Sequence, residues 1–466
     1  MIASVTGSSG RVGTARGVGA HPRSTGIRLP RIETTLALTV AVSIASAPGL
    51  LPRPAATQAL LTGTTMAIAL AVAWSARRAL GPRQPARSAA RAWAASMGTC
   101  ISIGAMYWNL LWQNRLRTVM EAPEVDWHYA VDVVGGATCV ALVLWGIGRA
   151  TRRTATALGG VRSIIVIAVV GVLTYAVAVP ALRSAVSASF AASNSTLDET
   201  VTAPNTTTRS GGLDSLVPWG TLGREGRKFV TGGLLPTTVR TYVGLDSAPT
   251  LDRRVELAVA DMERAGAFDR RVVVVAIPTG SGWVDENAIT GAESRFGGDV
   301  ATVAVQYSDK PSWATFLFAE EEARRSAEAL ADAVAARAAT KSAPPQIVLY
   351  GQSLGAVAGS EAYGSLRQTD PGVCGAVWVG PPAGTVNTDG ATVLVNSSDP
   401  VVRWSVNLLW SAPDSTATHH DAPTPVWIPF VSFVQTSVDL AAALDVNDGH
   451  GHRYGTDQGT SMPLCT

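Results

Sequence analysis

Apolar and polar residues are distributed unevenly along the 466-residue chain. Five long apolar stretches follow one another in its first part, separated by short charged loops. Each approaches the roughly 20 residues that a helix needs to cross a bilayer core. Five in succession are more than the buried helices of a water-soluble domain explain, so the pattern predicts an α-helical membrane domain with about five transmembrane helices. The stretches lie near 34–51, 57–76, 92–112, 129–148 and 163–182.

The character of the sequence changes on either side of these stretches, which gives the domain boundaries. Residues 1–32 are rich in Gly, Ser and Arg and lack an apolar period, which is typical of a disordered basic tail. The membrane domain then covers 33–183. Residues 184–215 are rich in Ser, Thr and Asn and predict a linker. Residues 216–466 are long enough for one globular domain.

The arginines predict how the membrane domain is oriented. They are concentrated in the tail, in the loop between the second and third stretches, and in the loop between the fourth and fifth. Cytoplasmic loops carry an excess of Lys and Arg. With five spans and a cytoplasmic N-terminus, a multi-pass protein of the cell membrane would hold its C-terminal domain outside the cytoplasm. A count that is wrong by one span would reverse this orientation.

In 216–466 the apolar pattern changes to short β-branched runs that alternate with amphipathic helices. This rhythm predicts an α/β-hydrolase type of layer architecture, a mainly parallel sheet with helices on both faces. The clearest helix covers Ala319–Ala339. The expected strands are Val272–Ile277, Ala301–Tyr307, Gln346–Tyr350, Ala376–Val379 and Val393–Asn396.

The motif Gly351-Gln352-Ser353-Leu354-Gly355 comes directly after one of these strands and before a helix. This strand–turn–helix setting is the one that a nucleophile elbow requires. The turn forces Ser353 into a strained backbone conformation, so that its hydroxyl projects at the end of the sheet. The helix N-terminus that follows favours a developing oxyanion. A tight turn between strand and helix without chemistry is the alternative reading.

A nucleophilic serine needs a base and an acid that orients the base, and in this fold they follow in the order Ser, Asp or Glu, His. Asp399 ends a strand and a polar turn and is the expected acid. The loop with His450 and His452 offers the base, and His450 is slightly preferred. Weaker candidates remain for both roles. They are Asp370, Asp389, Asp414 and Asp421 for the acid, and His419 and His420 for the base.

The oxyanion hole of this fold uses two backbone N–H groups. One comes from the residue after the nucleophile, Leu354. The other comes from the loop after an earlier central strand, where Thr279 and Gly280 are the candidates. A metal site that would use Asp448, His450 and His452 has no further ligand cluster beside it, so neither a metal nor another cofactor is expected.

Composition agrees with a membrane protein. Hydrophobic residues make up 47% of the chain and charged residues 15%, against about 25% charged residues in an average soluble domain. The net charge of +2 gives no indication of a nucleic-acid partner. Of the four cysteines, Cys374 and Cys465 belong to the C-terminal domain. If that domain is exported they could form a disulfide, and two separate thiols are the alternative.

Several further segments of the sequence are long and specific. In the N-terminal half they are Ala47–Arg53, Gln58 and Gly63; in the C-terminal half they are Ser215–Arg227, Pro278–Trp283, Gln306–Ser308, Tyr350–Gly355, Ser398–Val401 and Gly449–Tyr454. On these segments the chain resembles the membrane-anchored α/β-hydrolase family of actinobacteria and other bacteria, long described as of unknown function. The chain departs from the family pattern at Gly49, Gly220 and Gln352.

The resemblance implies an N-terminal multi-span module joined to a hydrolase module, with Ser353, Asp399 and the double-histidine loop at the triad positions. We expect a serine hydrolase that acts on an ester or thioester of a lipid or cell-envelope component. Its partners would be the lipid bilayer and a small-molecule or lipid ester. The alternatives are an acyltransferase with the same triad, and a non-catalytic membrane protein that uses the hydrolase fold for binding or to assist transport.

Overall fold

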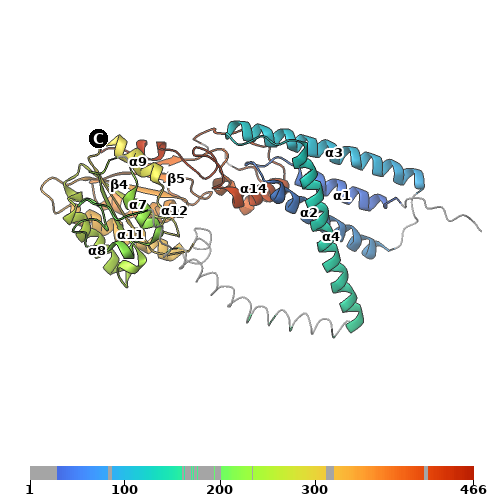
Figure 1. Ribbon diagram of the computed structural model, residues 1–466, viewed down its shortest axis with the longest axis horizontal. Coiled ribbons are helices and arrows are strands. Elements are labelled where there is room, and N and C mark those ends of the chain that lie inside the picture. The colour runs from blue at the N-terminus through green and yellow to red at the C-terminus, as the bar shows by residue number, and fades with distance from the viewer. Residues whose placement is uncertain are drawn as a thin grey trace, which may run out of the picture.

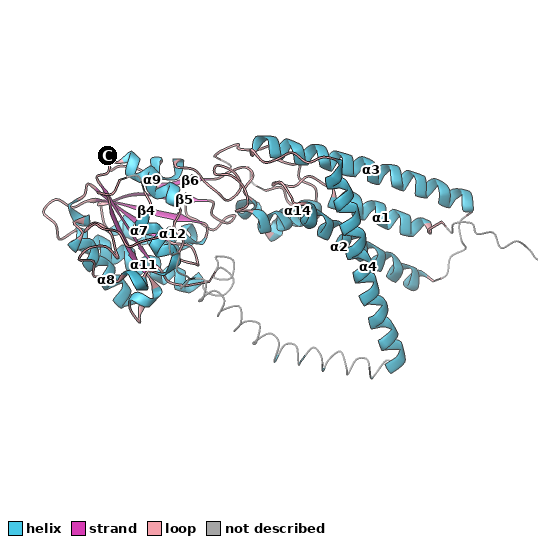
Figure 2. Ribbon diagram, viewed as in Figure 1, coloured by secondary structure: helices cyan, strands magenta, loops and turns pink. Residues whose placement is uncertain are grey.

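The computed structural model describes most of the chain. The described residues are 29–81, 87–159, 201–233, 235–310, 320–413 and 418–465, with the single positions Arg162, Val169, Val172, Ala176 and Asn194. Four long helices lie at one end of the molecule and a β-sheet domain at the other (Figures 1 and 2). The expected basic tail lies almost wholly outside the described residues, and so does the fifth apolar stretch apart from three single positions.

The four helices coincide with the first four apolar stretches. They are α1 (Ile32–Ala45), α2 (Ala55–Leu80), α3 (Ser88–Val119) and α4 (Trp127–Leu158). Among the described residues, α2 and the segment Trp127–Ala157 of α4 are long and apolar enough to cross a membrane, and α1 is apolar but shorter. The structure therefore gives two candidate spans, where the sequence predicted about five.

These helices leave much of their apolar surface uncovered. Helix α4 pairs along part of its length with α2, and α1 packs against both α2 and α3. Yet Val72 of α2 is 62% exposed and Val143 of α4 is 61% exposed. A core helix of a soluble protein would bury such side chains, because burial of apolar surface is what stabilises it. Large exposed apolar side chains recur along all four helices, among them Leu36, Ile68, Trp108, Leu142 and Trp145.

The second domain contains a six-stranded sheet in which all strands run parallel. The strands are β1 (Val239–Val243), β2 (Val272–Ile277), β3 (Val300–Val305), β4 (Gln346–Gln352), β5 (Val373–Val379) and β6 (Ala391–Leu394), in the spatial order β1-β3-β2-β4-β5-β6. The neighbouring strands β2 and β3 are buried throughout and consist of Val, Ala and Ile apart from Thr302. Such continuous apolar runs are expected where helices cover both faces of a parallel sheet.

Helices cover both faces, as the sequence predicted. Helices α8 (Leu251–Arg264), α11 (Glu320–Ala338) and α12 (Leu354–Thr369) pack side by side, and Gly359 of α12 lies against Trp378 and Ile277. On the opposite face α9 (Glu286–Arg295) packs with α15 (Asp457–Thr460), where Gln458 accepts a hydrogen bond from Tyr350. The other α-helices that the structure describes in this domain are α7 (Gly223–Thr231), α13 (Pro400–Arg403) and α14 (Val431–Asp439).

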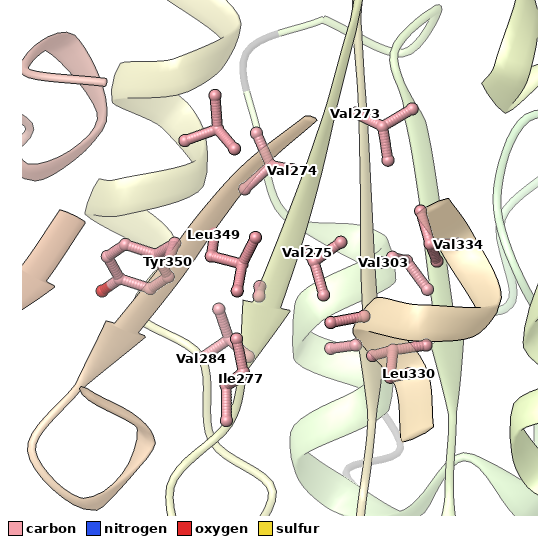
Figure 3. Close-up of a cluster of buried hydrophobic side chains, with 14 of the residues drawn as sticks. Val273, Val274, Val275, Ile277, Val284, Val303, Leu330, Val334, Leu349 and Tyr350 are labelled. Carbon is pink, nitrogen blue, oxygen red and sulfur yellow. The ribbon is translucent and has the colours of Figure 1, made fainter. Parts of the chain in front are cut away.

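The core of this domain lies between the sheet and its helices. Figure 3 shows Leu330 and Val334 of α11 against valines of the central strands, with Tyr350 and Val284 across the sheet. Cys374 at the start of β5 forms a disulfide with Cys465, their Cα atoms 4.7 Å apart. The sequence left a disulfide and two separate thiols as alternatives, and the structure has the disulfide. It ties the C-terminal end of the chain to the sheet.

A buried ion pair joins the two ends of the molecule. Helix α14 lies between the sheet domain and the ends of the long helices (Figure 1). Arg53, in the turn between α1 and α2, donates from Nε to Asp439 Oδ1 at 2.8 Å, and the two side chains are 1% and 0% exposed. Arg53 also donates to the backbone oxygen of Gln435, and Leu50 N donates to Asp439 Oδ2 at 2.7 Å.

Candidate active site

Ser353 has the backbone conformation that the elbow motif predicted. Its φ of 55° and ψ of −121° place it among four non-glycine residues with positive φ in the described part of the chain. A conformation this costly persists only where the surroundings impose it, and such residues cluster at functional sites. Here β4 ends at Gln352 and α12 begins at Leu354, which leaves one residue for the turn. A Cβ on Gly355 would collide with the backbone oxygen of Ile277, so the motif's second glycine is required.

Asp399 receives a complete set of hydrogen bonds in a fully buried position. Its Oδ1 accepts from Val401 N at 2.8 Å, and its Oδ2 accepts from Tyr454 Oη at 2.7 Å. The same Oδ2 lies 2.8 Å from Nδ1 of His452. A carboxylate at Nδ1 fixes the imidazole in the tautomer that carries its proton there, which leaves Nε2 as the basic nitrogen.

The second histidine of the loop pairs with a different acid. Nδ1 of His450 lies 3.1 Å from Oδ2 of Asp421. Asp421 also accepts from Ser397 Oγ at 2.9 Å and from Ser398 N at 3.0 Å, and it bonds the Ser398 hydroxyl. Ser398 Oγ in turn accepts from Gly451 N at 2.7 Å. Asp421 thus braces the turn before Asp399 against the histidine loop.

The geometry reverses the preference between the two histidines. The sequence slightly favoured His450 as the partner of Asp399, whereas the structure pairs Asp399 with His452. Gly451, with φ 54°, turns the chain between them so that each ring meets a different aspartate. The His452 side chain is 8% exposed and that of His450 is 17% exposed. Two histidines separated by one glycine look alike in sequence, because the direction of each ring depends on this turn.

Hydrogen bonds to the backbone of His452 hold its loop at the elbow. Gln352, the residue before Ser353, donates from Nε2 to the oxygen of His452 at 3.1 Å. His452 N donates to Ala443 O at 2.9 Å. At the end of β5, a Cβ on Gly380 would lie 2.8 Å from His452 Cε1 and 2.9 Å from Asp399 Oδ2, so this position has room for glycine alone. In the described residues Ser353 Oγ makes no hydrogen bond to an imidazole; such contacts often tighten only with substrate bound.

The structure narrows the choice of oxyanion donors. Thr279 N donates to Trp283 O at 2.9 Å, which closes the turn after β2 and occupies this N–H. Within the described part of the chain, the N–H groups of Leu354 and Gly280 have no hydrogen-bond acceptor. Both are buried at the carboxyl edge of the sheet, where β2 and β4 lie side by side. Leu354 and Gly280 are therefore the pair available to an oxyanion, and Thr279 is not.

The other sequence candidates that the structure describes lie away from this arrangement. Asp370 Oδ1 accepts from Gly372 N beyond the end of α12, and Asp389 is exposed. Of the two other histidines, His420 is exposed and His419 contacts Asn396. Asp414 lies outside the described residues. Across the residues that the structure describes, no three His, Cys, Asp or Glu side chains come together as a metal site.

The sequence did not identify Tyr454 as a functional residue. Its hydroxyl donates to the same oxygen of Asp399 that His452 contacts. Burial raises the pKa of Tyr454 well above its ordinary value, and the negative charge of Asp399 adds to the shift, so the phenol keeps its proton. The signal available in the sequence was position alone, since Tyr454 comes two residues after His452 in an otherwise polar segment.

Two family models match the chain. A model described as an alpha/beta-hydrolase family matches residues 239–391 and 387–462. A model described as the N-terminus of an alpha/beta-hydrolase family matches residues 47–233. The first match covers the sheet and all residues of the candidate site, and the second covers α2, α3, α4 and the turn with Arg53. No curated protein matches the chain.

Proposed function

The chain belongs to an alpha/beta-hydrolase family, and on that premise we propose that it is a membrane-anchored serine hydrolase with Ser353 as nucleophile, His452 as base and Asp399 as the orienting acid. The observation that carries the proposal is the strained Ser353 at the end of β4, beside a loop that presents a buried His452–Asp399 pair. The expected substrate is an ester or thioester of a lipid or cell-envelope component, since the protein works at a bilayer.

In the proposed reaction His452 Nε2 takes the proton of Ser353 as Oγ bonds to the carbonyl carbon. Asp399 stabilises the imidazolium that forms. When the tetrahedral intermediate collapses, the bond to the alcohol or thiol breaks and the leaving group takes the proton from His452. A water molecule, deprotonated by His452, then releases the acid and restores Ser353. Tyr454 remains protonated and holds the Asp399 carboxylate in place.

The N–H groups of Leu354 and Gly280 would donate to the oxyanion of each tetrahedral intermediate. Donors that are fixed before the reaction stabilise developing charge strongly, because no reorganisation is needed at the moment of reaction. The N-terminus of the 16-residue helix α12 adds a positive partial charge at the same point. This half of the mechanism depends on backbone groups, which side-chain substitutions leave in place.

Exposed apolar side chains on α1–α4 support the membrane anchor. In the most apolar 18-residue stretch of each helix, only 11% of α4 and 22% of α2 is buried within the protein. Such surface is costly in water and stable in lipid. The arginine distribution of the loops favours a cytoplasmic N-terminus, and the Cys374–Cys465 disulfide is typical of a domain outside the reducing cytoplasm.

Turnover of short-chain chromogenic esters by the purified full-length protein tests the proposed chemistry. Wild type should hydrolyse them, and Ser353→Ala should lose the activity while keeping its thermal unfolding profile. Ser360→Ala is a matched control, because Ser360 lies on the same helix and bonds Asn387 N away from the elbow. Full activity in Ser353→Ala would refute the assignment of the nucleophile.

Reporter fusions test the proposed orientation. A phosphatase that is active only after export should be active when fused after Thr466 and inactive when fused near Gly81. The opposite pattern would place the hydrolase domain in the cytoplasm and contradict an odd number of spans.

A further inference from the structure

A cavity of about 180 Å³ lies where the turn after α1 meets the segment that surrounds α14. Pro48, Gly49 and Leu50 line it from the helical end of the molecule. Residues of the hydrolase domain between Arg403 and Thr436 line the rest. The cavity is next to the buried Arg53–Asp439 pair, because Gly49 and Gln435 line the cavity and also lie against that pair.

Twelve described residues line this cavity, and among them Arg403 alone carries a charge. Within the described residues its guanidinium makes no hydrogen bond and no ion pair, although the side chain is half-buried. The negative charge of Asp421 acts on it, but that carboxylate is already hydrogen-bonded to Ser397, Ser398 and His450. Burial lowers the pKa of Arg403, yet an arginine remains charged at neutral pH.

A half-buried cation without a protein partner is less favourable than a paired one, because burial removes part of the water around the guanidinium and no described residue replaces that water by a hydrogen bond. The five N–H donors of an arginine guanidinium lie in one plane and match the oxygens of a phosphate or carboxylate. Thr424, Ser432 and Thr436 add hydroxyl groups to the lining. The cavity is thus suited to an anion and unsuited to a cation or a purely apolar group.

Exposed apolar side chains lie close in the chain to residues that line this cavity. Leu408 and Trp427 line it, whereas apolar residues next to them in the sequence are outside the lining and exposed. Trp410 is 59% exposed and stacks edge-on against Phe430, which is 60% exposed. Large exposed apolar groups next to a membrane anchor are typical of residues that enter the bilayer interface. The other members of this exposed set are Val406, Val426 and Ile428.

We propose that this cavity binds the anionic head group of a membrane lipid, with Arg403 as its counter-charge and the exposed set around Trp410 and Phe430 in contact with the acyl chains. The site lies one short helix beyond Asp399, because α13 begins at the Asp399 cap and ends at Arg403. A lipid held there would fix the hydrolase domain against the bilayer surface. This role is separate from the serine chemistry.

Lipid binding by the full-length Ser353→Ala protein tests the assignment, because this variant removes any contribution from turnover. Native mass spectrometry in neutral detergent would compare bound phosphatidylglycerol with bound phosphatidylcholine at equal concentrations. Phosphatidylglycerol should be retained preferentially. Adding Arg403→Gln should weaken phosphatidylglycerol binding by about tenfold or more, the effect of losing charge-assisted hydrogen bonds, and leave phosphatidylcholine binding unchanged.

Arg295→Gln is the matched control, since Arg295 is an exposed arginine at the end of α9, on the sheet side of the molecule. Arg403→Lys, which keeps the charge and is expected to fold, should retain most of the preference. Unchanged phosphatidylglycerol binding in Arg403→Gln would overturn the proposal. So would Arg403-dependent binding of inorganic phosphate without a preference for the anionic lipid, because the site would then take a free anion. Each of these results can occur whether or not Ser353 is a nucleophile.

Discussion

The two ends of the molecule treat apolar side chains in opposite ways. In the sheet domain Leu349 is completely buried between the strands and their helices, whereas Leu142 in the middle of α4 is 60% exposed. Both residues are leucines within regular structure, so their local preferences do not explain the difference. The sheet domain builds a core of its own, whereas the helical domain leaves much of its apolar surface uncovered, as expected if that surface faces lipid as we propose.

The same contrast extends to charge. In the sheet domain the buried Arg240 has a partner of opposite charge, Glu293, at 2.7 Å. The outer surfaces of α2 and α4 have almost no charge until their arginine-rich ends. The Arg53–Asp439 pair breaks this division, because it takes one partner from each end of the molecule and buries both. Gln435 and Asn447 also donate to backbone oxygens of the helical domain, so several polar contacts join the two ends. Under the proposed membrane anchor, the two domains would face different solvents.

The largest expected effect is the loss of activity on substitution in the histidine loop, because the proposed chemistry belongs to the sheet domain alone. His452→Ala should lower kcat/KM for an ester by about 10,000-fold, as expected when a triad member is lost. His450→Ala should cost less than about tenfold, because its partner Asp421 braces the loop without contacting Asp399. Steady-state kinetics of both variants measure the difference. Equal losses would mean that neither pairing identifies the base.

Next in size is the junction between the domains. Arg53→Ala leaves Asp439 buried without its partner and should lower the free energy of unfolding by about 3–5 kcal/mol. Arg77→Ala, which removes an exposed pair with Glu33 at 3.9 Å, should cost no more than about 1 kcal/mol. Denaturation in mild detergent would compare them. The double variant Arg53→Met with Asp439→Leu removes both charges and should be more stable than Arg53→Ala. If the two are equally unstable, the unpaired charge of Asp439 does not cause the loss of stability.

Matched leucine truncations test the comparison itself. Leu349→Ala should lower the free energy of unfolding by about 2–5 kcal/mol, because it opens a cavity in a close-packed core. Leu142→Ala, measured in the same detergent, should change it by less than about 1 kcal/mol, since the side chain has few protein neighbours to lose. Similar costs at the two positions would show that α4 is covered by protein rather than by lipid.

The disulfide should contribute a comparable or smaller amount. Replacing both Cys374 and Cys465 by Ser should cost about 2–4 kcal/mol, because the bond constrains a long loop in the unfolded chain. Alkylation of the unfolded, non-reduced protein should leave these two cysteines unmodified and modify Cys100 and Cys139, which are free. Alkylation of all four would contradict both the disulfide and the oxidising compartment that we propose.

Much of this architecture could be predicted from the order of residues. The valine runs of β2 and β3 and the Gly-x-Ser-x-Gly turn are local signals, and they fixed the parallel sheet and the elbow. The pairing of Asp399 with His452 could not be predicted, because it depends on the left-handed Gly451 between the histidines. Nor could the partner of Arg53, which lies 386 residues away in the sequence. Contacts of that range are set by packing and leave no local pattern.

The central claim is that Ser353 is a nucleophile activated by His452. Its most direct test is to treat the full-length protein with a fluorophosphonate and to locate the adduct by peptide mass spectrometry. Our account predicts one adduct on the Ser353 peptide of wild type, none in Ser353→Ala, and labelling that is slowed severely in His452→Ala and little in His450→Ala. An adduct on another serine, or labelling of Ser353 at the wild-type rate in His452→Ala, would contradict it.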